Sequence, residues 1–231
     1  MRHPILATLA ALLLALGLSG AANAGPFQDG MAAYERGDYA TAFRLWRPLA
    51  DQGNARAQVI LGSMLEFGQG VPQNHAEAVK WYRTAAVQGN ANGQFSLGFI
   101  YDIGQGVPQN HAEAVKWYRL AADQGYANAQ INLGVMYAKG EGVPQNHAEA
   151  LKWFRLAADQ GNARAQYNLG VMFEFGQGAP QNHVQAHKWF NLAGAGGVED
   201  GRKGRDMVTK AMTPARIAEA QRLASEWKPK Q

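Results

Sequence analysis

Apolar residues recur along the chain at helical spacing, in pairs of segments that are joined by a fixed glycine-rich loop. The first segment of a pair follows Asn54, a good N-cap residue, and ends before Gly68; the second follows Asn74, with Glu77 three residues on as in a capping box. The apolar positions of the two segments are Ala57, Leu61, Met64 and Leu65, then Ala78, Trp81, Tyr82, Ala85 and Ala86. Each set lies on one face of a helix, so the pattern predicts two antiparallel amphipathic helices.

This pair of helices is repeated along the chain with a period of 36 residues. Four copies span 53–88, 89–124, 125–160 and 161–196, and 68–83 is identical to 104–119. Residues 25–52 match the same plan less closely and are interpreted as a degenerate N-terminal repeat. A feature that returns in every copy is explained by packing on the neighbouring copies, so function is expected to lie in the positions that differ.

Glycine recurs inside the first helix of each copy, at Gly62, Gly98, Gly134 and Gly170. Because glycine costs about 1 kcal/mol in a helix relative to alanine, these positions predict close approach of a bulky side chain from the second helix. The loop 68–74 is rich in glycine but follows a helix and lacks a Gly-Lys-Ser/Thr ending, so it does not fit a phosphate-binding loop. Gly68 and Gly70 are instead expected to need positive φ.

The two ends of the chain do not follow the repeat. Residues 1–24 carry Arg2, an apolar run and a small-x-small ending at Ala24, which predicts a signal peptide; an uncleaved membrane anchor is the alternative. No integral membrane segment is expected after cleavage, and the protein is expected to be exported, to the periplasm or beyond the cell. Residues 197–231 are expected to form a C-terminal helical cap, with Thr213 and Pro214 opening its last helix, and a frayed tail from Lys228.

Composition removes several classes of function. The chain has no cysteine, which excludes disulfides, thiol catalysis and a cysteine-based zinc site. The formal net charge of +4 comes mainly from the last 35 residues, because 25–196 hold 13 basic and 13 acidic residues. A neutral repeat body lacks the basic stripe of a nucleic-acid binder, so no nucleic-acid partner is expected.

Few residues could carry chemistry. His75, His111, His147 and His183 recur in separate repeats, too far apart to share an ion, and His183 with His187 is the only i,i+4 pair. We therefore expect no metal and no cofactor. No unique Ser/His/Asp set or carboxylate pair stands out, so no catalytic residue is assigned. The recurring tryptophans, such as Trp81, could stack on sugars or bases, but the alanines around them favour burial between repeats.

Together, the runs Ala-x-Ala-Gln-x-x-Leu-Gly, Gly-x-Gly-Val-Pro and Lys-Trp-Tyr-x-x-Ala-Ala resemble the Sel1-like repeat family, which is related to tetratricopeptide repeats. The resemblance covers 37–196 and extends weakly to the closing helix near Thr213. It implies an all-α fold, a right-handed α/α superhelical solenoid of helix-turn-helix repeats with a C-terminal capping helix. It also implies an adaptor or scaffold for protein complexes, often in the bacterial envelope or in host interaction.

Five positions of the first helix vary between copies, and their spacing places them on one face, which lines the concave side in tetratricopeptide-like arrays. We predict that this concave stripe binds a partner protein or peptide, with Phe95, Phe99 and Tyr167 as accessible anchors. The alternative is that these side chains fill the inner curve of a tight superhelix. The stripe consists of Arg56, Val59, Ser63, Glu66, Phe67, Asn92, Phe95, Phe99, Asp102, Ile103, Asn128, Ile131, Val135, Lys139, Arg164, Tyr167, Val171, Glu174 and Phe175.

The sequence thus predicts a monomeric, non-catalytic scaffold or adaptor, periplasmic or secreted, that binds a protein or peptide. A host-interaction factor is one alternative. An envelope-associated hydrolase is the other, because some cysteine-rich relatives are described in that way, although this chain lacks cysteine altogether.

Overall fold

The computed structural model describes residues 25–230, and in that range the chain forms twelve α-helices and no strand. The predicted signal peptide lies outside the described residues. None of the described helices has the length and apolar character that a membrane span requires. The helices are α2 (Pro26–Glu35), α3 (Tyr39–Asp51), α4 (Ala55–Phe67), α5 (His75–Val87), α6 (Ala91–Ile103), α7 (His111–Asp123), α8 (Ala127–Lys139), α9 (His147–Asp159), α10 (Ala163–Phe175), α11 (His183–Ala195), α12 (Glu199–Thr209) and α13 (Pro214–Ser225).

The helix ends lie where the sequence places them. The side chain of Asn54 accepts a hydrogen bond from the Ala57 amide at 3.0 Å, and that of Asn74 accepts one from Glu77 at 3.0 Å. Helix α4 ends at Gly68, whose φ of 66° is left-handed. Gly70 has a φ of 73°, and a Cβ there would lie 2.4 Å from the carbonyl carbon of Tyr39. Both predicted N-caps and both positive-φ glycines are confirmed.

Three of the four glycines inside the first helices, Gly62, Gly134 and Gly170, are packing notches, as predicted. A Cβ on Gly62 would lie 2.7 Å from the Tyr82 ring, one on Gly134 would lie 2.7 Å from Phe154, and one on Gly170 would lie 2.4 Å from Phe190. The aromatic side chain of the second helix therefore lies directly on the backbone of the first. This contact sets the spacing of the two helices within a repeat.

A buried glutamine ties each first helix to the helix before it. Gln58 donates from Nε2 to the carbonyl oxygen of Ala50 at 3.0 Å, and Gln130 donates in the same way to Ala122 at 3.1 Å. The same bond recurs from Gln94 to Ala86 and from Gln166 to Ala158. Each of these carbonyls also accepts a backbone hydrogen bond from the glycine three residues later, so the recurrent Gln adds a second bond that links consecutive repeats.

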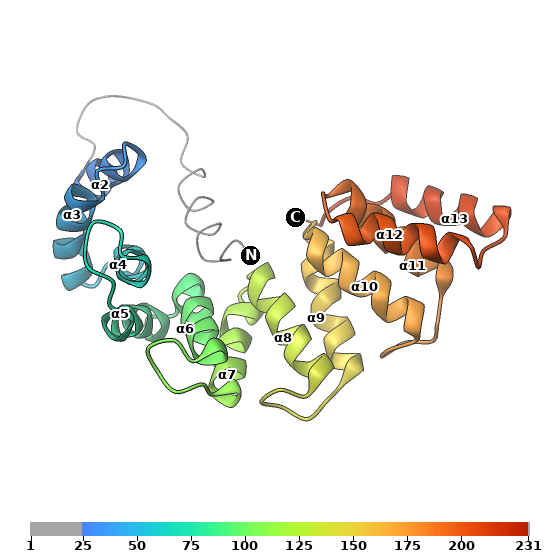
Figure 1. The fold of residues 1–231 in the computed structure, drawn as a ribbon, viewed down its shortest axis with the longest axis horizontal. Coiled ribbons are helices and arrows are strands. Elements are labelled where there is room, and N and C mark those ends of the chain that lie inside the picture. Colours follow the sequence, from blue (N-terminus) through green and yellow to red (C-terminus); the bar gives the residue numbers. More distant parts are fainter. Residues whose placement is uncertain (1–24, 231) are drawn as a thin grey trace. The chain divides into compact units, whose positions relative to one another are not determined.

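The helices form two compact units, one reaching to Trp117 and the other starting at Tyr118. In the first unit, α2 packs on α3, α3 on α4, α4 on α5 and α5 on α6, and Figure 1 shows these neighbouring helices side by side. In the second unit, α8 to α12 pack in the same consecutive way, and α13 packs on α11. The core of each unit is a continuous layer of apolar side chains between consecutive helices.

The recurring tryptophans differ in burial. Trp153 and Trp189 are buried, as expected, whereas Trp81 and Trp117 are only partly buried. Trp81 packs on the apolar core of the first unit, and the Arg47 guanidinium, 5.2 Å from the ring centroid and 3.6 Å from Glu77, covers part of the indole.

The described part of the C-terminal tail, which the sequence predicts to fray from Lys228, makes two contacts with Asp159 of α9. The Lys230 amide donates to the carbonyl oxygen of Asp159 at 2.7 Å, and the Lys230 ammonium contacts the Asp159 carboxylate at 2.7 Å. Trp227 packs edge-on against Trp189, with 6.2 Å between ring centroids. These long-range contacts hold the tail against α9 and α11, and no local sequence pattern encodes them.

Candidate binding site formed by α10, α11 and α12

The structure corrects part of the concave stripe. The side chains of Val59, Ser63, Glu66, Phe95 and Ile131 are buried, and Phe95 is only 1% exposed, so the expectation of an accessible anchor at Phe95 is wrong. Helix α4 is buried along ten consecutive residues from Ala57 to Glu66. A first helix packs on its own second helix and on a neighbouring repeat, which leaves little of its circumference in solvent. At these five positions the alternative interpretation, side chains that fill space, fits better.

The remaining stripe positions reach solvent to different degrees. Ile103, Lys139, Arg164 and Phe175 are exposed. The partly buried members are Arg56, Phe67, Asn92, Phe99, Asp102, Asn128, Val135, Tyr167, Val171 and Glu174.

Several of these stripe residues have contacts inside the repeat array. The Arg56 guanidinium lies 5.0 Å from the Phe27 ring centroid. An oxygen of Asp102 lies 3.0 Å from Nδ1 of His111, and Lys139 pairs with Glu141 at 3.5 Å. The ring of Phe99 stacks on that of Phe95 with 6.5 Å between centroids. A structural role therefore accounts for these side chains.

Four stripe residues of the fourth repeat instead line one pocket in the second unit. Tyr167, Val171, Glu174 and Phe175 come from α10, and the pocket has a volume of about 250 Å³. The other lining residues come from the two following helices and are Phe190 on α11 with Asp200, Lys203, Gly204 and Met207 on α12. The pocket has apolar walls and carries charge at only three positions, a composition that suits a side chain with an apolar body.

Two large apolar side chains of this pocket remain in solvent. Phe175 is 66% exposed and Met207 is 59% exposed, although both line the same hollow. The ring of Tyr167 lies against Phe190 at 5.7 Å between centroids, so the inner wall is an aromatic pair. An exposed apolar surface beside a hollow is typical of a binding site.

Helix α12 completes the pocket because glycines let it lie very close to α11. A Cβ on Gly204 would lie 2.9 Å from the Phe190 ring, and one on Gly201 would lie 2.8 Å from the backbone nitrogen of Gly194. These glycines stand three residues apart, on one face of α12. Their spacing is visible in the sequence as a small-residue face, which was the signal for this contact; the predicted concave stripe contains no residue of α12.

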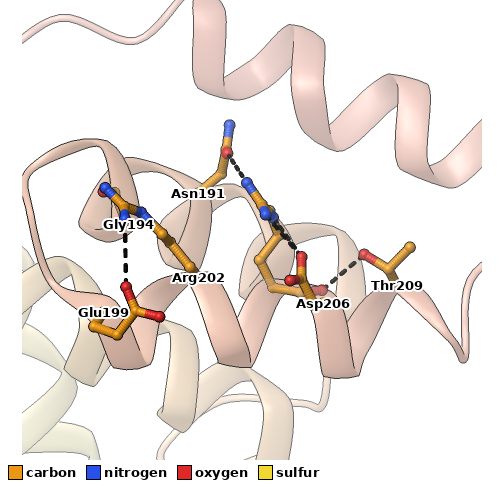
Figure 2. A network of polar contacts seen from close by, with 7 residues as sticks. Asn191, Gly194, Glu199, Arg202, Asp206 and Thr209 are labelled. Carbon is orange, nitrogen blue, oxygen red and sulfur yellow. Dashed lines mark hydrogen bonds and ion pairs between the residues drawn. The ribbon is translucent and has the colours of Figure 1, made fainter.

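Polar contacts then fix α12 in register with α11, as Figure 2 shows. Nε of Arg202 donates to the carbonyl oxygen of Gly194 at 3.3 Å, and Nη1 of Arg205 donates to the Asn191 side chain at 3.4 Å. Arg205 also pairs with Asp206 at 2.8 Å. Two arginines of α12 therefore bind α11, and these hydrogen bonds position the pocket wall that α12 supplies.

The pocket has an uneven distribution of charge. Asp200 and Lys203 form an i,i+3 ion pair at 3.4 Å in solvent. Glu174 has no ion-pair partner among residues 25–230. Partial burial raises the pKa of its carboxyl, an effect that the nearby His183 partly opposes. A desolvated, unpaired carboxylate favours a cation as its ligand.

A second hollow, of about 360 Å³, lies between α3 and α5 in the first unit. Its lining residues are Arg47, Asn74, Ala76, Glu77, Lys80, Trp81 and Thr84. Here Arg47 already pairs with Glu77 and covers Trp81.

The histidine pair singled out in the sequence, His183 and His187, lies on α11. Residues 25–230 contain no group of three or more His, Asp or Glu side chains that could hold a metal ion. Of the His183 and His187 pair, His187 is buried, and its Nδ1 has no hydrogen-bond partner there. Burial, followed by the nearby Arg205, lowers the pKa of His187.

Comparison with known proteins identifies the repeat. The family model described as the Sel1 repeat matches 20–54, 55–90, 91–126, 127–162 and 163–198, which is most of the chain. These boundaries lie about two residues beyond those drawn from the sequence, and a fifth match covers the degenerate first repeat. No curated protein matches the sequence significantly.

Solved structures of repeat proteins resemble the chain over most of its length. A Sel1 repeat protein from Oxalobacter formigenes has 30% identity and a TM-score of 0.76, covering 87% of this chain and 85% of that one. A protective antigen of uropathogenic Escherichia coli with an SLR fold has 27% identity and a TM-score of 0.51, covering 87% and 60%. An immunity protein from Pseudomonas aeruginosa has 18% identity, a TM-score of 0.54 and coverage of 89% and 83%, a likeness of fold alone.

Proposed function

This chain belongs to the Sel1 repeat family, an all-α repeat solenoid, and we propose that it is a non-catalytic scaffold that binds a segment of a partner protein. The binding site is the pocket formed by α10, α11 and α12. One observation carries the proposal, namely that Phe175 of α10 and Met207 of α12 remain largely exposed while both line the same pocket. Side chains of this size stabilise an interface when a partner removes them from water.

We further propose that the scaffold acts after export, in the periplasm or outside the cell. The support comes from the sequence of 1–24 and from the absence of cysteine, which makes the fold independent of the redox state of its surroundings.

The proposal is tested by crosslinked co-purification from the native envelope fraction. The bait is the mature protein, compared with a Phe175→Ser/Met207→Ser variant. Both side chains are exposed, so the variant is expected to fold, which circular dichroism checks. The matched control is Leu156→Ser, which removes a 41% exposed apolar side chain from α9 of the same unit.

The expected result is a partner that parent and control capture and that the double variant loses, and that then binds the purified parent directly. Equal capture by all three proteins would place the binding surface elsewhere. Turnover of envelope fragments by the purified protein would contradict the non-catalytic role.

A further inference from the structure

The fourth repeat differs from the first at one member of a pair formed by an acid and an aromatic ring. The last turn of the first helix carries an acidic residue at Glu66 and at the equivalent Glu174, 108 residues later in the chain. The second helix carries an aromatic ring that faces the notch glycine, at Tyr82 and at the equivalent Phe190. The two repeats therefore share the acid and the ring but differ by one hydroxyl group.

In the first repeat that hydroxyl satisfies the acid. The Tyr82 hydroxyl donates to Oε2 of Glu66 at 2.7 Å, and both side chains are fully buried. The acid is thus a core residue and has no access to a ligand. Burial strongly raises the pKa of this carboxyl, to about 7, and the Tyr82 bond opposes that shift.

In the fourth repeat the ring keeps its place and the bond is lost. The Phe190 ring lies on Gly170 as the Tyr82 ring lies on Gly62, but phenylalanine has no donor. The Glu174 side chain then lines the pocket instead of the core. Within the part of the chain that the structure describes, its carboxylate has neither a hydrogen-bond donor nor an ion-pair partner, although the nearby His183 acts on it electrostatically.

The charged residues that line the pocket leave this carboxylate without an ion-pair partner. Asp200 and Lys203 neutralise each other at the rim, which leaves one negative charge beside the apolar walls. An ionic bond at a partly desolvated carboxylate is stronger than the same bond in open solvent. The pocket is therefore complementary to a cation that is attached to an apolar group.

We propose that the pocket binds a short basic-apolar segment of a partner protein, in which an arginine or lysine pairs with Glu174. The neighbouring apolar side chain of the segment lies over Val171 and Phe190, between Phe175 and Met207. This inference rests on the proposed function and names the chemistry of the segment that the scaffold recognises.

Capped tetrapeptides with the sequences Gly-Arg-Leu-Gly, Gly-Lys-Leu-Gly and Gly-Gln-Leu-Gly test the proposal. Each is titrated into the mature protein, and the Met207 methyl resonance is followed by NMR, with Met207→Leu to assign it. The two basic peptides are expected to bind about 5-fold more tightly than the Gln peptide, the gain of one partly exposed ion pair.

Two variants remove this preference by different routes. Glu174→Gln deletes the charge. Phe190→Tyr introduces a hydroxyl equivalent to that of Tyr82, which donates a hydrogen bond to the acid in the first repeat. Both are expected to reduce the ratio of affinities to about 1. Glu219→Gln is the control, because it removes one exposed negative charge from α13, outside the pocket, and is expected to keep the 5-fold preference. Thermal unfolding checks that all three variants fold.

The outcomes separate this inference from the proposed function. A Met207 shift of equal affinity with all three peptides would overturn the basic-apolar segment and leave an apolar binding site standing. No shift with any peptide would overturn both. A shift that depends on protein concentration alone would mean that the pocket holds a second copy of the chain, which also overturns the inference.

Discussion

The hydroxyl of Tyr82 donates a 2.7 Å hydrogen bond to the carboxyl of Glu66, and neither side chain reaches solvent. The second oxygen of this carboxyl, Oε1, has no hydrogen-bond partner among the described residues. One hydrogen bond does not replace the hydration that a carboxylate loses on burial. The pair therefore makes the stability of the first unit depend on pH.

Stability should fall as the pH rises through the range in which Glu66 ionises. The folded protein keeps a proton on this carboxyl up to about pH 7, whereas the unfolded chain releases it near pH 4.5. The folded state binds more protons in that window, so Glu66 lowers the free energy of unfolding between pH 4.5 and 7, by on the order of 3 kcal/mol.

Glu66→Gln keeps an acceptor for Tyr82 and removes the charge. The variant is expected to be more stable than the parent at pH 8 and similar at pH 4.5, measured by urea unfolding across this range. A constant difference at every pH would show that Glu66 does not titrate in this window.

His187 should have the opposite effect in the second unit. It replaces the apolar Val79 of the first repeat at a buried position, next to Arg205 and Asp206, and its pKa is lowered by burial and then by Arg205. The neutral His187 ring contributes to the free energy of unfolding above pH 6.5, and this contribution is lost as the pH falls through the lowered pKa of the folded protein. When the pH is lowered to 5, His187→Leu should therefore lose less of its free energy of unfolding than the parent does. Equal acid sensitivity of the two proteins would refute this role.

Filling a notch should separate the two helices of a repeat. Gly134→Ala places a methyl group 2.7 Å from the Phe154 ring and is expected to destabilise the protein by about 1–3 kcal/mol, although alanine favours the helix. Phe154→Leu in the same chain makes room for that methyl. The double variant should lose less than the sum of the single losses, measured by chemical denaturation. If the losses of the two single variants added exactly in the double variant, the Phe154 ring would not be the reason why position 134 needs glycine.

The tail contacts should stabilise the C-terminal end through apolar packing more than through charge. Trp227→Ala removes the ring that packs on Trp189 and is expected to cost about 1–3 kcal/mol. Lys230→Ala breaks an ion pair whose ammonium is largely exposed and should cost less than about 1 kcal/mol. Thermal unfolding of both variants tests the order; a larger loss for Lys230→Ala would reverse it.

The repeat, its helix caps and the glycines that receive an aromatic ring could be predicted because each depends on contacts within a single repeat. Asn74 caps the helix that follows it, and Gly62 receives the ring of Tyr82 twenty residues later in the same repeat. A binding stripe could not be predicted in the same way. Phe95 and Phe175 both vary between repeats and are both aromatic, yet one is buried and the other is exposed.

By itself, the sequence determined the helical pairs, the period that stacks them and the family to which they belong, since local spacing and capping encode all three. Only the tertiary structure decided which variable residues reach solvent. Helix α12 lies on α11 because Gly201 and Gly204 leave room for it, and this contact turns the exposed face of α10 into a pocket. The role of Glu174 was decided there too, because the absence of one hydroxyl, on Phe190, matters only where ring and acid meet in space.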